Sequence, residues 1–582
     1  MAEPFIRITN LHFQYRSPEG RVLPALRGIS LEIEPGEYVA LVGANGSGKS
    51  TLVRHLNALL LPDQGEVWVE GLNTRDVTVH PLIRQRVGMV FQFPEDQIVA
   101  SVVEDDVAFG LENLGLSDEE IRRRVAEILQ TLGLWEHRSR PPHLLSAGQI
   151  QRLALAGVLV LRPRCLILDE ATTMLDPQGR LRLLALVESL NHEGVTLIHV
   201  THHMEEAARA KRVIVLHQGR VVLDGSPAEV FADAERVKAL GLETPPTLQL
   251  AQQLHRIYAG FPALALHPED LLAKIPAYPG IQESCPTLPE DHREPSHAPF
   301  IEVDNLAHTY LQGTPLAHVA LQDVHLRVGE GEAVALMGAT GSGKSTLLQH
   351  LNGLLRPQQG RVRVGPYHLE TLKDVRPVRW YAGLLMQNPE MQFFETFVGD
   401  EVAFAPRLMG VKDLRERVRW ALEMVGLDFE VYKDRLLFTL SGGERRKVAL
   451  ASILAMQPKV LLLDEPTAGL DPGSRRELVL NLQQLKAHGT TLVIATHHLD
   501  DLLSMIDGVE VLFRGRNQMG GVPARIFNGW LSLEPVGLVT PLLYRVAQKL
   551  QQQGWPVPWT NEEEGLIHAV QTALRVGHER VV

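Results

Sequence analysis

An internal repeat constrains this chain more than any other feature of its sequence. Residues 43–62 (GANGSGKSTLVRHLNALLLP) and 338–357 (GATGSGKSTLLQHLNGLLRP) agree at 15 of 20 positions, at an offset of 295. The same offset pairs Gln92 with Gln387, and one inserted residue later changes it to 296. Because a long repeat encodes a recurring structural unit, we expect the 582 residues to fold as two copies of one domain.

Composition indicates where the two copies end. Residues 262–299 contain eight prolines, six acidic and two basic residues, which predicts a semi-extended, solvated tether and no helix. Apolar periodicity over 248–258 predicts a helix in the tail of the first copy. The expected segments are a first domain over 1–235, a helical tail and Pro-rich linker over 236–299, a second domain over 300–527, and a C-terminal helical tail over 528–582.

Strand-like apolar runs such as YVALVG and CLILDE alternate with helical stretches such as 180–192 in each copy. This alternation predicts an α/β layered fold with a largely parallel sheet.

Composition also excludes several classes of protein. With 57 basic and 69 acidic residues the net charge is −12, which argues against non-specific nucleic-acid binding. Two cysteines cannot form a disulfide framework, and Cys165 is expected to be a buried thiol. The longest apolar stretch, 153–161, is about half of what a bilayer crossing needs, and the N-terminus has no signal core. We therefore expect a cytoplasmic location.

Both copies carry the phosphate-binding pattern GxxxxGK[ST] between an apolar run and a helical one. Glycines allow backbone N–H groups to close around phosphate oxygens, and a helix N-terminus favours negative charge. The lysine is expected to reach the β- and γ-phosphates, and the following serine to offer a hydroxyl to Mg²⁺. The predicted phosphate-site residues are Gly43, Asn45, Gly46, Gly48, Lys49, Ser50 and Thr51 in the first copy and Gly338, Thr340, Gly341, Gly343, Lys344, Ser345 and Thr346 in the second.

A pair of acids ends a later apolar run in each copy, CLILDE and VLLLDE. Asp169 and Asp464 are suited to hold the Mg²⁺ shell, and Glu170 and Glu465 to orient or deprotonate an attacking water. The alternative, a solvated acid pair in a loop, does not explain why both copies place it directly after an apolar strand.

The motifs LSAGQ (145–149) and LSGGE (440–444) lie between these elements. A P-loop, a later glutamine, an LSGGQ-like signature, an LxLDE strand, an LDP turn and a following histidine together resemble the ATP-binding cassette (ABC) ATPases, over nearly all of both copies. The resemblance implies two tandem P-loop nucleotide-binding domains that hydrolyse ATP with Mg²⁺, each with a helical signature subdomain and a short helical C-terminal tail.

The resemblance also implies that the two halves pair head to tail around two nucleotides. The first site would combine Tyr15, Lys49, Ser50, Gln92, Asp169, Glu170 and His202 with Ser441 and Gly443. The second would combine Tyr310, Lys344, Ser345, Gln387, Asp464, Glu465 and His497 with Ser146 and Gly148. The catalytic groups would be Glu170, Glu465, His202, His497, Gln92 and Gln387, and the magnesium ligands Ser50, Gln92, Asp169, Ser345, Gln387 and Asp464.

Two positions are open to a second interpretation. Tyr15 and Tyr310 would stack on adenine, although a lone aromatic can equally serve packing. Ala147 replaces the middle glycine of the signature and adds a Cβ where backbone approaches phosphate, which predicts unequal activity of the two sites.

The segments after the two glutamines carry a finer resemblance. QFPEDQ (92–97) and QNPEMQFF (387–394) are followed by EDDVAFG and GDEVAFA, and together they resemble the energy-coupling-factor (ECF) transporter ATPases, here fused. This implies two membrane partners: a coupling (T) protein that docks near these loops, and a small substrate-capture (S) protein for a vitamin or transition-metal ion. The ATPase would attach peripherally to the cytoplasmic face of the membrane. Its tails, 236–260 and 528–582, would hold the halves together or pack only against their own domains.

The main alternative is a ribosome-associated ABC ATPase with two cassettes. Such proteins join their halves by a charged helical arm, whereas the connector here is Pro-rich with a net charge of −4, so no nucleic-acid partner is expected. A DNA-repair type would carry a coiled-coil insertion, and a duplicated sugar-importer ATPase often has a degenerate second half. Neither feature is found, and the sequence leaves the transported solute open.

Overall fold

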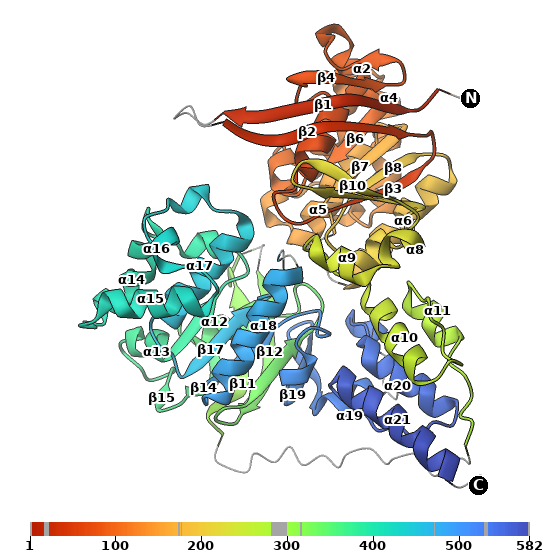
Figure 1. The fold of residues 1–582 in the computed structure, drawn as a ribbon. Helices are drawn as coiled ribbons and strands as arrows, with labels where there is room; N and C mark the ends of the chain where they lie inside the picture. Colours follow the sequence, from red (N-terminus) through yellow and green to blue (C-terminus); the bar gives the residue numbers. More distant parts are fainter. Residues whose placement is uncertain are drawn as a thin grey trace. The chain divides into compact units, whose positions relative to one another are not determined.

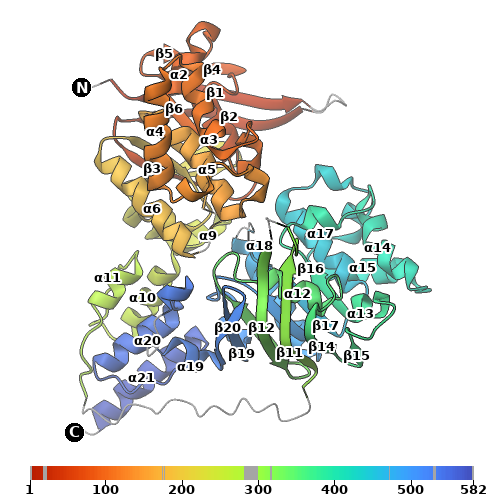
Figure 2. The same ribbon diagram turned by 180° about the vertical axis from the view of Figure 1, so that it is seen from behind.

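The computed structural model describes residues 3–16, 22–172, 175, 177–280, 299–314, 317–468, 470, 472–528 and 533–579. The chain forms two compact units, each with sheets of its own (Figures 1 and 2). The first unit consists of Met1–Gln252 and Ala263–Leu271, and the second of Gln253–Pro262 and Leu272–Val582. Part of the tail of the first copy, Gln253–Pro262, therefore belongs to the second unit.

The first unit contains an antiparallel sheet in the order β2-β1-β4-β5 and a six-stranded sheet in the order β10-β9-β3-β8-β7-β6. Neighbours in the second sheet are parallel except β9 and β10. The strands are β1 (Ile6–Arg16), β2 (Val22–Ile33), β3 (Tyr38–Val42), β4 (Gln64–Val69), β5 (Leu72–Asn73), β6 (Val87–Val90), β7 (Cys165–Asp169), β8 (Thr196–Val200), β9 (Arg212–His217) and β10 (Arg220–Gly225).

The second unit repeats this arrangement with sheets β12-β11-β14-β15 and β16-β17-β18-β13-β19-β20. The last pair of the larger sheet is again antiparallel. The strands are β11 (Ile301–Tyr310), β12 (His318–Val328), β13 (Ala333–Met337), β14 (Gln359–Val364), β15 (Tyr367–His368), β16 (Ala382–Leu385), β17 (Val460–Asp464), β18 (Thr491–Ala495), β19 (Gly508–Phe513) and β20 (Arg516–Gly521).

Helices follow the strands in both copies. Those of the first half are α1 (Lys49–Leu56), α2 (His80–Arg86), α3 (Val103–Asn113), α4 (Asp118–Thr131), α5 (Ala147–Leu159), α6 (Pro177–His192), α7 (Met204–Ala207), α8 (Pro227–Phe231), α9 (Ala234–Ala239), α10 (Pro246–Ile257) and α11 (Pro268–Ala273). Those of the second are α12 (Lys344–Leu351), α13 (Arg376–Tyr381), α14 (Val398–Leu408), α15 (Leu414–Met424), α16 (Phe429–Tyr432), α17 (Gly442–Leu454), α18 (Pro472–Ala487), α19 (Pro523–Phe527), α20 (Leu542–Gln552) and α21 (Glu563–Glu579). Over the described residues, none of them has both the length and the apolar character of a membrane-crossing helix.

The central strand β3 shows why this sheet corresponds to uninterrupted apolar runs. Val39 and Leu41 face a core shared with the antiparallel sheet and α1. Tyr38, Ala40 and Val42 face a second core shared with α3 and α5. Because successive side chains point to opposite faces, a strand covered on both sides must be apolar throughout. The predicted α/β layered fold is confirmed, and so is the burial of Cys165.

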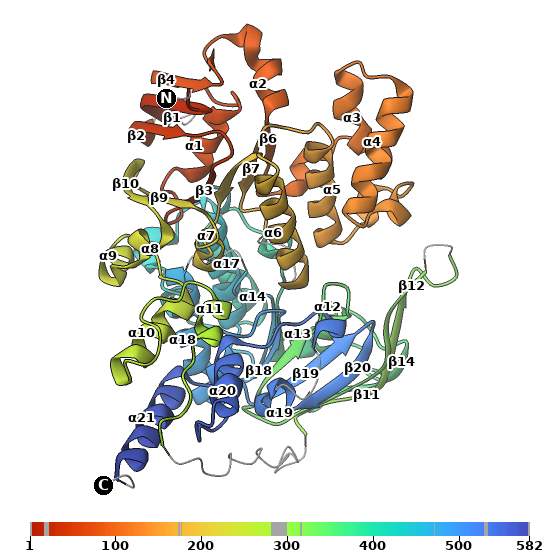
Figure 3. The same ribbon diagram turned by 90° about the vertical axis from the view of Figure 1, so that its right-hand side faces the viewer.

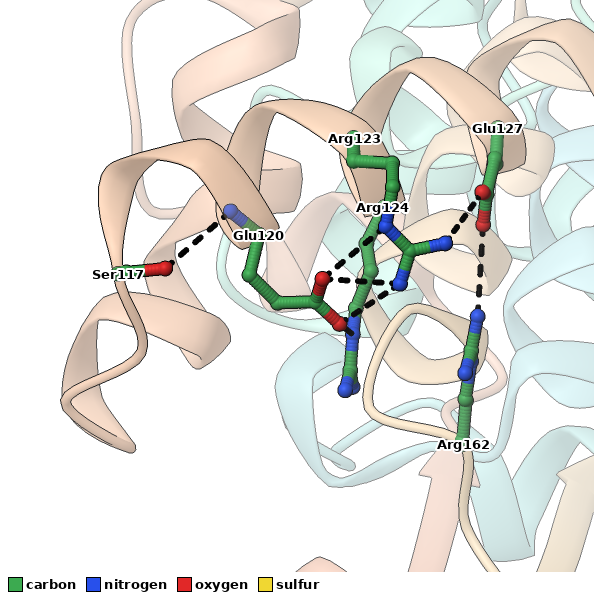
Figure 4. A network of polar contacts seen from close by, with 6 residues as sticks. All are labelled: Ser117, Glu120, Arg123, Arg124, Glu127 and Arg162. Atoms are coloured by element: carbon green, nitrogen blue, oxygen red, sulfur yellow. Dashed lines mark hydrogen bonds and ion pairs between the residues drawn. The ribbon is translucent and has the colours of Figure 1, made fainter.

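In the first unit α3, α4 and α5 lie side by side as a helical subdomain (Figure 3). Ser117 caps α4, and on the solvent side of this helix Arg123 pairs with Glu120 and Glu127 at 2.8 and 2.7 Å. Arg162, which follows α5, reaches Glu127 at 3.4 Å (Figure 4). Because the pairs are solvent-exposed, they stabilise the helix only slightly.

Buried Trp555 joins the tail of the first copy to the end of the second copy within the second unit. The centroid of its ring lies 5.2 to 6.1 Å from those of Tyr258, Phe261 and Tyr278. Its Nε1 donates to the Pro276 carbonyl at 2.8 Å. Aromatic rings of this size contribute much of the apolar area that a small cluster can bury. The segment before the linker is therefore docked against the C-terminal helices.

The prediction that 262–299 forms a semi-extended tether is wrong for its first part, which contains α11 (Pro268–Ala273). Proline is tolerated at the first helical position, where its missing N–H would have no intrahelical partner. Glu269 and Asp270 in the first turn add a favourable interaction with the helix dipole. The rest of the predicted tether, residues 281–298, lies outside the described residues.

Replacing Trp555 by alanine is expected to destabilise the second unit by about 3–5 kcal/mol, the usual cost of truncating a buried aromatic side chain. Thermal unfolding would measure that loss. The docked segment should also become accessible to trypsin at Arg256 and Lys274, as mass spectrometry would detect. Trp559→Ala is the control, because that ring stacks on Tyr544 and not on the segment. Equal cleavage in both variants would contradict the docking.

Candidate nucleotide-binding site

The predicted catalytic residues of each copy lie at the ends of four adjacent parallel strands. In the first unit the P-loop follows β3, Gln92 follows β6, Asp169 ends β7 and His202 follows β8. Parallel strands bring their carboxyl ends to one edge, where α/β proteins bind ligands. The second unit repeats the pattern with β13, β16, β17 and β18, and its corresponding residues are Gln387, Asp464 and His497.

The P-loop requires glycine where it enters the helix. Gly48 and Gly343 cap α1 and α12 with φ of 103° and 104°. A Cβ at these positions would lie 2.7 Å from the Ala25 carbonyl oxygen and 2.6 Å from that of Ala320. The backbone can therefore take this path only without a side chain. Each loop then leads into an eight-residue helix whose first N–H groups are available to an anion.

The P-loop lysines place a positive charge inside the loop. Lys49 Nζ donates to the carbonyl oxygens of Gly43 and Ala44 at 2.8 and 3.2 Å. Lys344 makes the two equivalent bonds at 2.7 and 3.1 Å. An ammonium group beside a ring of backbone amides suits a polyphosphate ligand.

A serine and a buried aspartate form the candidate magnesium site of each copy. Ser50 Oγ donates to Asp169 Oδ1 at 3.0 Å. Burial, and then the charge of Glu170, raises the pKa of Asp169 to about 6. Burial also raises the pKa of Asp464, against the opposing hydrogen bond from Ser345. Hydroxyl and carboxylate oxygens are the ligands that Mg²⁺ prefers, and a buried carboxylate gains most from a cation, so the residues fit this ion.

The adjacent glutamates adopt an unusual backbone conformation. Glu170 and Glu465 have φ of 53° and 49°, in the left-handed region, which costs a non-glycine residue roughly 1–2 kcal/mol. Their N–H groups donate to Val200 and Ala495 on the neighbouring strand. Both copies keep this strained conformation at the same place, the strand end that carries the acidic pair.

The two glutamate carboxylates have different neighbours. Glu170 Oε2 accepts a hydrogen bond from Gln92 Nε2 at 2.9 Å and lies 3.6 Å from His202 Nδ1. Glu465 Oε1 lies only 2.6 Å from His497 Nδ1. Burial opposes ionisation of both carboxylates, but the histidines and P-loop lysines outweigh it and hold the pKa of Glu170 and of Glu465 below the usual value. Both glutamates are therefore ionised at neutral pH, as a proton acceptor requires.

One ring nitrogen of His202 remains available for a ligand. Its Nε2 is buried and has no hydrogen-bond partner among the described residues. Buried polar atoms are normally paired, so this nitrogen fits a group absent from the protein itself, such as a phosphate oxygen.

In each copy a second glutamine lies five residues after Gln92 or Gln387. No role is predicted for it from the sequence alone. Gln97 accepts a hydrogen bond from the Phe91 N–H at 2.8 Å and donates to the Met89 carbonyl at 3.1 Å. Gln392 makes the equivalent bonds. These side chains fix the loops that carry Gln92 and Gln387. The spacing of five residues, shared by both copies, was the sequence signal for this role.

The signature motifs form helix N-termini. Ser146 and Ser441 are the N-caps of α5 and α17, each in a capping box with the Gln or Glu three residues later. Gly148 and Gly443 lie in the first turn. Over the described residues, no hydrogen bond joins either serine to the P-loop of its own copy. The side chain of Ala147 and parts of both LDP turns lie outside the described residues.

The two tyrosines lie at the start of the P-loop helices. Tyr15 is 39% exposed and its hydroxyl lies 3.2 Å from Thr51 Oγ1. Tyr310 is 36% exposed and has the same distance to Thr346. Each ring has an accessible part beside the loop, and stacking on adenine stays a prediction.

A family model described as ABC transporter matches residues 26–173 and 321–468, one stretch in each copy. The chain belongs to the ABC transporter family. A relative from Caldanaerobacter subterraneus subsp. tengcongensis, provisionally named an ABC transporter ATP-binding protein, is 34% identical over 94% of this chain and 97% of its own length.

Two shorter relatives are each named energy-coupling factor transporter ATP-binding protein EcfA1. The one from Symbiobacterium thermophilum is 52% identical over 47% of this chain and 98% of its own length. The one from Caldanaerobacter subterraneus subsp. tengcongensis is 48% identical over 46% of this chain and 98% of its own length. The chain is thus a tandem ABC ATPase, which binds and hydrolyses ATP, and each of its units is an α/β nucleotide-binding fold.

The raised pKa of Asp169 predicts how the stability of the ligand-free ATPase depends on pH. The folded state binds more protons than the unfolded state between about pH 4 and 6, so stability falls as pH rises through that window. Asp169→Asn removes this effect and should stabilise the protein by up to about 3 kcal/mol at pH 7.5 and about 1 kcal/mol at pH 4.5. Calorimetry without Mg²⁺ or nucleotide measures the difference. Asp96→Asn, at an exposed acid, is the control, and equal gains at both pH values would contradict the prediction.

Proposed function

We propose that this ABC ATPase energises an ECF-type importer for a vitamin or a transition-metal ion, working peripherally at the cytoplasmic face of the cell membrane. An integral membrane coupling protein would dock on it, and a small membrane capture protein would hold the solute. The two ATP sites would form head to tail, with each P-loop facing the signature of the other copy.

The observation that carries this proposal is the exposure of apolar side chains on and beside both Gln92 and Gln387 loops. Phe93 and Val99 are 48% and 63% exposed in the first copy, and Met391 and Phe394 are 75% and 74% exposed in the second. Large apolar side chains gathered on a loop favour contact with a partner, because docking removes them from water. The first loop also touches the catalytic glutamate through Gln92, so a partner seated there would be coupled to the chemistry.

A groove beside the second loop supports a helical partner. It has a volume of about 480 Å³ and lies between α14, α15 and α16. Its lining combines apolar Phe397, Val418 and Phe429 with charged Arg407 and Lys433. A groove that combines apolar and charged side chains suits the end of an amphipathic helix. The similarity to the two EcfA1 proteins supports the same class of transporter.

In the proposed reaction the glutamates accept a proton from the attacking water, and the Nε2 of the histidines contacts the γ-phosphate. The P-loop lysines and amides hold the β- and γ-phosphates, and the signature serines complete the site from the other copy. Magnesium would neutralise phosphate charge when held by Ser50, Gln92 and Asp169 in one site and by Ser345, Gln387 and Asp464 in the other. Closure by ATP and reopening after hydrolysis would drive the membrane partner.

Glu170→Gln and Glu465→Gln should both lower ATP turnover, but by different amounts. The signature with Ala147 would complete the site of Glu465, and its added Cβ should make that site slower. Glu170→Gln should therefore cost at least about twofold more activity. Phosphate release from the purified chain measures this, with exposed Glu193→Gln as control. Equal losses would contradict the proposed inequality.

Purification of the tagged chain from its native cells in gentle detergent tests the transport role. We expect two small integral membrane proteins to copurify. The double variant Phe93→Ser/Phe394→Ser should lose them while its ATP turnover in isolation stays within twofold of the parent chain. Leu311→Ser, which changes an exposed apolar residue far from the loops in sequence, should retain both partners. Recovery of ribosomes, or of the ATPase alone, would contradict the proposed role in an importer.

A further inference from the structure

A buried arginine in the second copy has no counterpart in the first. Arg446 lies on the signature helix α17 and is 8% exposed. The repeat offset of 295 pairs it with Gln151 on α5, which is 2% exposed. Burial lowers the pKa of Arg446 to about 10, which leaves the guanidinium charged at neutral pH. A buried charge needs hydrogen-bond partners that offset the free-energy cost of its removal from water.

Those partners are two backbone carbonyls of the catalytic site. One terminal nitrogen of Arg446 donates to the carbonyl oxygen of Glu465, and the other donates to that of Gln387. The planar guanidinium has donors fixed in a fork, so it can bond two acceptors at a set separation, which a lysine cannot do. One side chain thus ties together the signature helix, the loop after β16 and the end of β17.

The bond to Glu465 acts on a residue whose conformation is strained. Glu465 has φ of 49°, and its backbone orientation determines where its carboxylate lies. The carboxylate is held from the other side by His497 at 2.6 Å and by Thr496 Oγ1 at 3.3 Å. With the carbonyl held by Arg446, both ends of the glutamate are fixed.

The first copy holds its glutamate differently. Gln151 Nε2 is buried and has no hydrogen-bond partner among the described residues. The link between loop and glutamate is instead made by Gln92, whose side chain donates directly to Glu170 at 2.9 Å. Gln387, by contrast, is an exposed residue whose backbone is held by Arg446.

We propose that Arg446 is a positioning residue for hydrolysis at the site of Glu465, and that it transmits the position of the Gln387 loop to that glutamate. The first copy carries out the same step without this residue. The inference rests on the ATPase activity of the family and not on the importer, so it can be tested with the purified chain alone.

The test is single-turnover hydrolysis of radiolabelled ATP in a Glu170→Gln background, where the second site carries the reaction. Arg446→Met should lower the rate of the chemical step by about tenfold or more, because small misplacements of a catalytic group are costly. The ATP concentration for half-maximal rate should stay within twofold. Arg446→Lys keeps the charge but can bond only one carbonyl well. Its rate should lie between those of the parent chain and Arg446→Met.

The matched control is Gln151→Met, the same substitution at the paired position, measured in a Glu465→Gln background. It should change the rate less than twofold. Hydrogen exchange gives a second readout that does not depend on activity. Arg446→Met should speed exchange in residues 386–394 and 464–468, whereas Gln151→Met should leave 91–99 unchanged.

Three results would overturn the proposal. The first is an equal loss for the two methionine variants, and the second is a rise in the half-maximal ATP concentration with an unchanged rate. The third is unaltered exchange in both segments of Arg446→Met. If that variant fails to fold, Arg446→Lys decides the question, because a rate equal to that of the parent would exclude a need for the two-carbonyl contact.

Discussion

Two carboxylates buried side by side at the end of an apolar strand constrain the rest of each copy. Asp169 and Glu170 are 1% and 8% exposed, and removing such groups from water is costly unless neighbours compensate. Three other strands of the sheet are each followed by a compensating group: Ser50 after β3, Gln92 after β6 and His202 after β8. The order of the parallel sheet is therefore what makes the acidic pair tolerable. A bound cation would relieve the remaining cost.

Much of this site could be predicted from the sequence because its residues sit at strand ends. An apolar run that stops at DE or at a glycine-rich loop specifies both the strand and the edge where its chemistry lies. The role of Gln97 was harder to predict, because it depends on the loop folding back so that this side chain bonds the backbone of Met89 near the end of β6 and of Phe91 just after it.

Two features depended on tertiary structure that a single sequence does not reveal. Helix α11 begins at a proline. The eight prolines in 38 residues favoured an extended tether, although Glu269 and Asp270 are typical of the first turn of a helix. Arg446 stands in a charged stretch, ERRK, of a kind that usually lies on the solvent side of a helix. The available signal was its spacing, because Leu450 and Ile453 follow at four and seven positions and belong to the buried face of the same helix.

The two copies keep the residues that are predicted to contact the nucleotide and differ in the residues packed behind them. The P-loop lysines, the acidic pairs and the histidines agree, whereas Arg446 replaces Gln151 behind the glutamate. The first copy also buries His199 against Glu206, behind His202. The position paired with His199 in the second copy is Ile494. Such second-layer changes alter how firmly a group is held without altering which group is present.

The docking of the first tail on Trp555 has a consequence for how such a chain can be encoded. The boundary between folding units does not coincide with the boundary between sequence repeats, because Gln253–Pro262 lies with the second copy. A gene divided within residues 281–298 would give two polypeptides, and the first would end in the aromatic segment that the second is built to receive. The aromatic contacts with Trp555 would be the same in both cases. Fusion replaces a concentration-dependent assembly by an intramolecular one with a fixed one-to-one ratio.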